Sequence, residues 1–137
     1  MQQNAEQAAA SGNVAFFSAL SDDAVGAAVR RRDEDGRTVL HAASAGGHSE
    51  VVDYLLQRGG KAVVNTADDE GWTPLMTASS VGVLKVANSL VDAGADVRVA
   101  NSGKRTCLHY AASKGHEPVV ALLIKSGAVL DGASASV

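Results

Sequence analysis

The sequence contains one cysteine and two prolines, and aromatic residues make up only 4% of its 137 residues. A single cysteine, Cys107, cannot form an internal disulfide bond. No N-terminal segment has the basic start and apolar core that a secretory signal requires. These absences predict a protein of a reducing compartment, and we expect it in the cytoplasm and the nucleus.

The chain also lacks a long apolar run and an excess of positive charge. Its longest apolar stretch, residues 118–124, is far shorter than the roughly 18 to 20 residues that span a bilayer. The net charge is -3, with 12 Lys and Arg against 15 Asp and Glu, whereas a phosphate-binding surface needs clustered basic residues. We therefore expect neither a membrane protein nor a nucleic-acid-binding protein. A chain of 137 residues with 46% hydrophobic residues suits one domain.

What the chain does have is a threefold internal repeat. The segments GRTVLHAASAGG, GWTPLMTASSVG and KRTCLHYAASKG align on Thr38, Thr73 and Thr106, which lie 35 and 33 residues apart. Around each Thr, an Asp or Asn stands five residues before, a Leu two after, and glycines nine and 21 after. The first interval is longer by two residues in GGKAVVNT, where a loop can lengthen without disturbing a helix. A fixed period near 33 residues indicates stacked structural repeats.

Each repeat predicts two helices. The Thr is expected to cap the first helix by accepting a backbone N–H, and Pro74 suits the first turn of such a helix. The glycine nine residues after the Thr permits the left-handed residue that ends this helix. The second helix carries an apolar stripe at i and i+4 spacing and ends at the later glycine. Its predicted buried residues are Val51, Val52, Leu55 and Leu56, then Val86, Ala87, Leu90 and Val91, then Val119, Val120, Leu123 and Ile124.

This pattern resembles the ankyrin repeat, most fully in DDEGWTPLMTASSVGVLKVANSLVDAGADV. The resemblance implies an all-α ankyrin-repeat solenoid that forms a single domain over residues 1–137. Its expected parts are a degenerate N-terminal capping repeat at 1–32, repeats at 33–67, 68–100 and 101–131, and a tail at 132–137. In the capping repeat, Gly12 takes the place between the helices, and Phe16, Phe17 and Leu20 are assigned to the second helix.

Three consecutive segments further resemble the gankyrin family of proteasome assembly chaperones. They are GRTVLHAASAGGHSEVVDYLLQRG, DDEGWTPL and TCLHYAASKGHEPVVALLIKSGA. This resemblance implies a monomeric protein-binding module that holds the C-terminal domain of a proteasomal ATPase in its concave face, without a cofactor. A generic ankyrin adaptor and a purely structural solenoid fragment are the alternatives. Because that family continues for further repeats, either the chain is part of a longer array or its last helices tolerate exposure.

Function must lie on positions that the repeats do not use for stacking. The residues just before each Thr and those at the end of each first helix are expected to form one concave strip. Trp and Arg are frequent interface anchors, although Trp72 could instead cover a neighbouring turn or a Lys side chain. By resemblance, Arg37 and Lys114 match basic groove residues that face acidic residues of the ATPase. The predicted partner-binding residues are Arg37, Trp72, Lys114, Arg105, Asp35, Asp69, Glu70 and Val81.

The third turn departs from the pattern, because Lys104 stands where the other two turns have glycine. Arg105 therefore need not share the geometry of Arg37. The histidines, His41, His48, His109 and His116, occupy repeat positions where their rings can bond nearby backbone, and Cys107 is expected to pack. No nucleophile, base and orienting group converge in any repeat, so we expect neither an enzyme nor a metal site.

Overall fold

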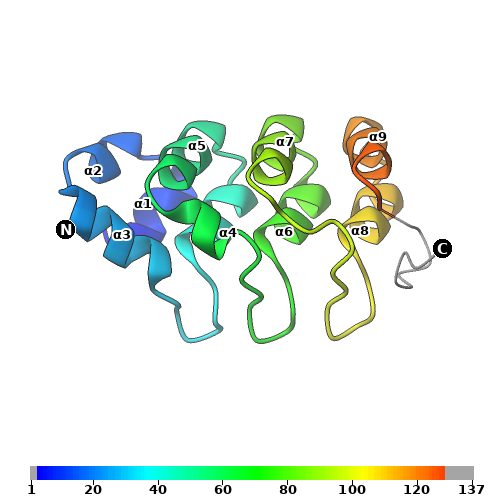
Figure 1. Ribbon diagram of the computed structural model, residues 1–137, viewed down its shortest axis with the longest axis horizontal. Helices are drawn as coiled ribbons and strands as arrows, with labels where there is room; N and C mark the ends of the chain where they lie inside the picture. Colours follow the sequence, from blue (N-terminus) through cyan, green and yellow to red (C-terminus); the bar gives the residue numbers. More distant parts are fainter. Residues whose placement is uncertain (1–2, 129–137) are drawn as a thin grey trace.

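The structure is a computed structural model that describes residues 3–128. Its helices form two layers, and three long hairpin loops project from one side of the stack (Figure 1). One layer contains α1 (Ala5–Ser11), α4 (Val39–Ala45), α6 (Pro74–Val81) and α8 (Cys107–Ser113). The other layer contains α2 (Val14–Ser18), α5 (Ser49–Gln57), α7 (Leu84–Asp92) and α9 (Glu117–Lys125). The predicted all-α solenoid is confirmed for the described residues.

The predicted helix starts are confirmed. Thr38, Thr73 and Thr106 are the N-cap residues of α4, α6 and α8, and each side chain accepts the N–H of the residue three positions later. In α4 and α8 that residue is a histidine, whose Nδ1 in turn accepts the N–H of the Thr at 3.0 and 2.9 Å. This reciprocal capping satisfies two backbone donors at each helix start. In α6, Pro74 occupies the first turn instead.

The predicted helix ends are also confirmed. Gly47, Gly82 and Gly115 follow the first helices with φ angles of 71°, 88° and 75°. The two extra residues of the first repeat lie in the loop that holds the 3-10 helix η1 (Gly60–Val63). Neither α5 before this loop nor α6 after it is interrupted, which confirms the prediction that the loop lengthens without disturbing a helix.

The apolar stripes of the second helices form the outer half of the core. Most of the predicted residues are buried, including Leu55, Leu90 and Leu123, which have no exposed surface. Burying a leucine side chain fully stabilises the fold by about 1.5 to 3 kcal/mol. The prediction was wrong for Ile124, which is 56% exposed, and only half right for Val91 and Val120, which are half-buried. The stripe of α5 is covered by α7, whereas no described element covers the far side of α9.

The N-terminal capping repeat differs from the expected helix pair. Helix α2 ends at Ser18, and the assignment of Leu20 to it was wrong. A further helix, α3 (Asp22–Arg30), begins instead at Ser21, whose side chain accepts the N–H of Ala24 at 3.1 Å. Ser followed by two aspartates is a strong helix start, because the hydroxyl caps the first turn and the carboxylates favour its positive end. Helix α3 packs against α4 and η1.

Three histidines join neighbouring repeats through backbone carbonyls. The Nε2–H groups of His48 and His116 donate to Ala10 O and Ser80 O at 2.9 and 3.0 Å. His41 Nε2–H donates to Trp72 O at 2.8 Å, because its Nδ1 already accepts the N–H of Thr38. Together with the capping role of His109, these bonds confirm that the histidines are structural.

The Cys107 thiol is buried and bonds Val97 O at 3.3 Å. Desolvation by burial raises the pKa of this thiol to about 11. The group is therefore protonated and unreactive at neutral pH. Its predicted packing role is confirmed.

Candidate protein-binding surface

Three hairpins with the same backbone precede α4, α6 and α8. In each, Oδ1 of the first residue (Asp33, Asp68 or Asn101) accepts the N–H groups of the residues two and four positions later, at 2.8 to 3.1 Å. The backbone N–H of the same residue donates to the carbonyl four positions later at 2.8 to 2.9 Å. These bonds explain why an Asp or Asn returns five residues before each capping Thr.

The third hairpin keeps this geometry despite its different sequence. Gly36 and Gly71 have φ angles of 79° and 86°, and Lys104 takes the equivalent conformation with a φ of 62°. Lys104 is the only residue other than glycine with a positive φ in the described part of the chain. Arg105 therefore occupies the same hairpin position as Arg37 and Trp72.

Neighbouring hairpin tips are joined by backbone hydrogen bonds. Asp69 N–H donates to Asp35 O, and Ser102 N–H donates to Glu70 O, both at 2.9 Å. The three loops accordingly stand in a row along one side of the stack (Figure 1). These hydrogen bonds hold the neighbouring tips side by side, as a strip along the hairpins requires.

Five of the eight predicted partner-binding residues meet in one open pocket between the first and second hairpins. Its volume is about 470 Å³, and its lining residues are Asp35, Arg37, Asp68, Asp69, Glu70 and Trp72. Four carboxylates face one guanidinium here, so the pocket is predominantly acidic.

Arg37 is partly engaged within the molecule. Its Nε lies 3.8 Å from Asp68 Oδ2, and the two side chains are 42% and 8% exposed. The Nε atom itself is buried and makes no hydrogen bond. At this distance the pair is an electrostatic contact, and the exposed part of the guanidinium remains available to solvent. Recognition of a partner carboxylate by Arg37 stays a prediction.

Trp72 packs on the next repeat. Its ring lies 4.3 Å from the ring of Tyr110, centroid to centroid, with the planes tilted by 33°. This agrees with the alternative in which Trp72 covers a neighbouring repeat, although the surface it covers is an aromatic ring of α8 and not a turn or a Lys side chain. Because Trp72 is only half-buried and also lines the acidic pocket, a contact with a partner stays a prediction.

The other three predicted residues lie outside the pocket. Arg105 and Lys114 are exposed, and Val81 is 43% exposed. Val81 is the last residue of α6, and Lys114 directly follows α8. These positions correspond to the expected ends of the first helices. They therefore extend the surface from the hairpins along the layer that contains α4, α6 and α8.

Sequence reasoning missed Tyr110. This residue lies four positions after its capping Thr, where the other repeats have Ala42 and Thr77. Its hydroxyl accepts a hydrogen bond from Asn101 Nδ2 at 2.7 Å, which ties the ring to the third hairpin. A large aromatic residue at an otherwise small position, one helical turn before Lys114, was the available signal.

Arg32 was also missed as a link between hairpins. Its Nε–H donates to Gly36 O at 3.0 Å, and its Nη2 donates to Ala67 O of the following repeat. The basic run before the first hairpin thus contains one arginine that braces the loop.

Residues 3–128 hold neither a metal-binding cluster nor a bilayer-spanning helix. No group of three or more His, Cys, Asp or Glu side chains is placed to hold a metal ion there. None of the helices in that range has the length and apolar character needed to cross a bilayer.

Two comparisons with known proteins agree on the repeat. The family profile described as ankyrin repeats (3 copies) matches residues 5–101 and 62–134. The ankyrin repeat-containing protein P16F5.05c of Schizosaccharomyces pombe is 45% identical to the chain over 94 residues. This alignment covers 69% of the chain but 64% of that protein, so the chain spans less than two thirds of the relative's length.

Proposed function

The chain belongs to the ankyrin-repeat family, whose repeats form a non-catalytic protein-interaction fold, and we propose that it is an assembly chaperone that binds the C-terminal domain of a proteasomal ATPase. The choice of partner rests on the resemblance to the gankyrin family. In this role the protein is a monomer of the cytoplasm and nucleus that covers the ATPase surface until assembly proceeds.

The observation that supports this proposal is the row of hydrogen-bonded hairpin tips, which carries exposed charges of both signs. Arg37 lies in the first hairpin and Lys114 directly follows α8, and each exposes a cationic group. A guanidinium can bind a carboxylate through two parallel N–H groups, whereas an ammonium acts as a point charge. Carboxylates of the partner would therefore meet both residues.

The acidic tips have a second role in the proposal. Asp35, Asp69 and Glu70 are exposed and would face basic residues of the same partner. Complementary charges at the rim of an interface mainly set orientation and association rate, with a smaller effect on the dissociation rate. Such an arrangement would bind the ATPase domain in one orientation.

The proposal is tested by capturing the purified ATPase C-terminal domain on the immobilised chain. We expect the double variant Arg37→Glu, Lys114→Glu to lose the complex. A matched control, Lys61→Glu with Lys85→Glu, makes the same charge change at exposed residues of η1 and α7, away from the hairpins and from α4, α6 and α8. This control should retain the complex. Thermal unfolding of all variants checks that the fold is intact.

A milder pair guards against a folding defect. A carboxylate at position 37 would lie next to Asp68, so Arg37→Gln with Lys114→Gln removes the charges without adding repulsion. This pair should weaken the complex while leaving the melting temperature close to that of the wild type. Capture of the ATPase domain that is insensitive to both pairs contradicts the proposed binding surface. A wild-type chain that does not capture the domain contradicts the proposed partner. Binding of a different protein by that chain would then favour a generic adaptor, and binding of none would favour a purely structural solenoid.

A further inference from the structure

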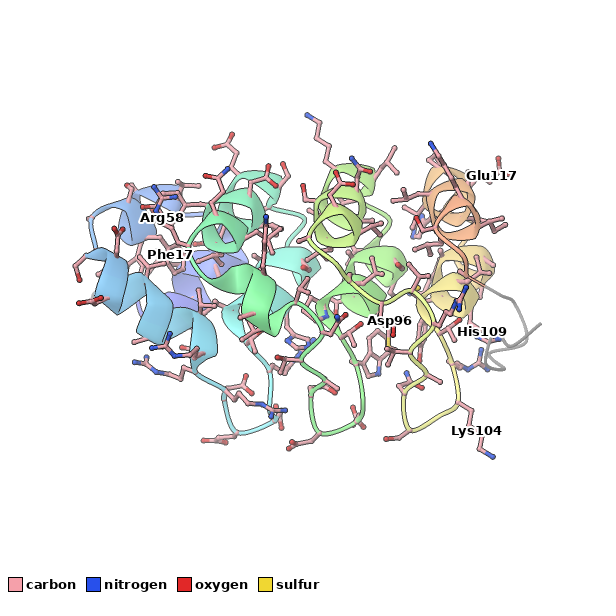
Figure 2. The ribbon with its side chains drawn as sticks, in the orientation of Figure 1. Phe17, Arg58, Asp96, Lys104, His109 and Glu117 are labelled. Carbon is pink, nitrogen blue, oxygen red and sulfur yellow. The ribbon has the colours of Figure 1, made fainter. Side chains whose placement is uncertain are left out.

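The third hairpin carries a charge opposite to that of the other two. Lys104 and Arg105 are exposed at its tip, and the exposed Lys114 follows the helix that the hairpin leads into. We name Lys104 and Arg105, the two basic residues of the hairpin itself, the basic patch. Within residues 3–128 neither these two residues nor Lys114 forms an ion pair. The Lys104 side chain extends away from the hairpin into solvent (Figure 2).

Lys104 is held in an unfavourable backbone conformation. Its φ of 62° falls in the left-handed region, which the equivalent Gly36 and Gly71 adopt without steric cost. A side chain with a Cβ is strained there, and such strain concentrates at functional sites. No described contact of the Lys104 side chain stabilises the fold in return. The lysine is thus a feature that folding does not explain.

The basic patch adjoins an aromatic surface. Asn101 joins the two, since its Oδ1 accepts Arg105 N–H at 3.1 Å and its Nδ2 donates to the Tyr110 hydroxyl at 2.7 Å. The Tyr110 ring stacks with Trp72. Positive groups beside half-buried aromatic rings can hold carboxylates and apolar side chains of one short segment.

We propose that the third hairpin docks an acidic polypeptide segment of the protein partner, with Lys104 and Arg105 receiving its carboxylates. This deepens the proposed function, on which it rests for the choice of binding face. It adds Lys104 to the partner contact and gives Arg105, already a predicted partner-binding residue, a carboxylate as its counter-ion. A nucleic acid is a poorer fit, because Asp69 and Glu70 stand on the adjoining hairpin, which is bonded to this one through Ser102. They would repel a continuous row of phosphates, whereas a peptide can place carboxylates only where the patch is basic.

The test measures binding of a fluorescein-labelled peptide rich in Glu with two Leu, by fluorescence anisotropy with the full chain at low and physiological salt. We expect Lys104→Gly to weaken binding about threefold, and Lys104→Gly with Arg105→Gln about tenfold. The control Lys85→Gln removes the same charge from an exposed position on α7 and should leave the affinity unchanged. The differences should shrink at higher salt.

A second readout separates binding from folding. Lys104→Gly should raise the melting temperature by about 2 to 5 °C because it relieves the backbone strain, so weaker binding by this variant cannot result from unfolding. Equal peptide affinity of the wild type and the double variant overturns the proposal. So does a lower melting temperature of Lys104→Gly, or tighter binding of a single-stranded oligonucleotide than of the acidic peptide.

The two proposals fail in different ways. If the ATPase domain does not bind but the peptide does so through Lys104 and Arg105, the proposed function is wrong and the docking site stands. If capture of the ATPase domain depends on Arg37 and Lys114 but not on Lys104 and Arg105, the docking site is wrong and the proposed function stands.

Discussion

The first two hairpins and the third share one backbone but carry opposite chemistry. The carboxylates of Asp33 and Asp68 each accept two backbone N–H groups in the first two hairpins. The neutral amide of Asn101 accepts the equivalent two in the third. Glycine occupies the left-handed position twice, and Lys104 occupies it once. Within the same scaffold, the tips therefore change from acidic to basic.

This difference shows which parts of a repeat are fixed by folding. The Asp or Asn that opens each hairpin, the capping Thr and the buried Leu make contacts that every repeat needs. Their chemistry therefore varies little along the chain. The residues between this Asp or Asn and the capping Thr are mainly exposed to solvent, so most of their side chains can change without altering the turn. Four sets of substitutions test this difference, in order of decreasing effect on stability.

The first residues of the second and third hairpins, Asp68 and Asn101, provide the strongest contrast. We expect Asp68→Ala to lower the free energy of unfolding by about 3 kcal/mol, since it removes charge-assisted hydrogen bonds to two N–H groups and leaves Arg37 without its carboxylate. Asn101→Ala should lower it by about 1.5 kcal/mol, because its bonds are neutral. Urea denaturation of both variants gives these values. An equal loss would show that the charge of Asp68 does not strengthen its turn.

The stacked aromatic pair links the two kinds of hairpin. Tyr110→Ala should lower the free energy of unfolding by about 2 kcal/mol, because Trp72 loses its packing partner and Asn101 loses a hydrogen bond. Tyr110→Phe should cost about 1 kcal/mol and keep the stacking. Fluorescence of Trp72, the only tryptophan, reports the ring directly: its emission should shift to the red in the alanine variant alone. A red shift in both would mean that the hydroxyl bond positions the ring.

His41 ties the first repeat to the second hairpin and should make stability depend on pH. Desolvation by burial lowers its pKa below 6.5, against the opposing hydrogen bond to the Trp72 carbonyl. Its neutral form is therefore favoured in the folded state, so the stabilisation is complete above pH 6.5 and is lost as the pH falls below it, by at most about 1.4 kcal/mol per pH unit. Urea midpoints at pH 7 and pH 5 measure this loss.

The second repeat supplies the control for this titration. It has Met76 at the equivalent position, so His41→Met should fold with a weaker midpoint at pH 7 and a smaller fall towards pH 5. A fall as large as that of the wild type would assign the titration to other groups.

The left-handed residue gives the smallest expected effect. Lys104→Asn should raise the free energy of unfolding by about 0.5 kcal/mol, because asparagine tolerates a positive φ better than lysine does. Arg105→Asn removes the same charge without occupying a left-handed position and should give no gain. Thermal unfolding of the pair measures the difference, and an equal change in both would indicate that charge, not backbone strain, is responsible.

The helices of the three repeats were predictable because their sequence signals are local, whereas α3 of the N-terminal capping repeat was missed. Thr before a helix and glycine after it act through hydrogen bonds and sterics within a few residues, and the apolar stripe needs only helical spacing. These rules predicted the starts of α4, α6 and α8 and the burial of Leu55, Leu90 and Leu123.

What could not be predicted depends on neighbours in space. The exposure of Ile124 reflects the lack of a described element over the far side of α9, although its position in the stripe equals that of Leu56. The stacking of Trp72 on Tyr110 joins residues of two different repeats. The contact of Arg37 with Asp68 likewise crosses from one hairpin to the next. A repeat alignment compares equivalent residues and does not show such pairs.

The hydrogen bonds from Asp69 to Asp35 and from Ser102 to Glu70 make the row of exposed loops resemble a sheet edge more than three separate turns. Amide protons of these two surface residues should therefore exchange slowly with solvent deuterium for loop positions. A partner would meet an edge that is already ordered, so it would lose less conformational entropy on docking than independent loops would require.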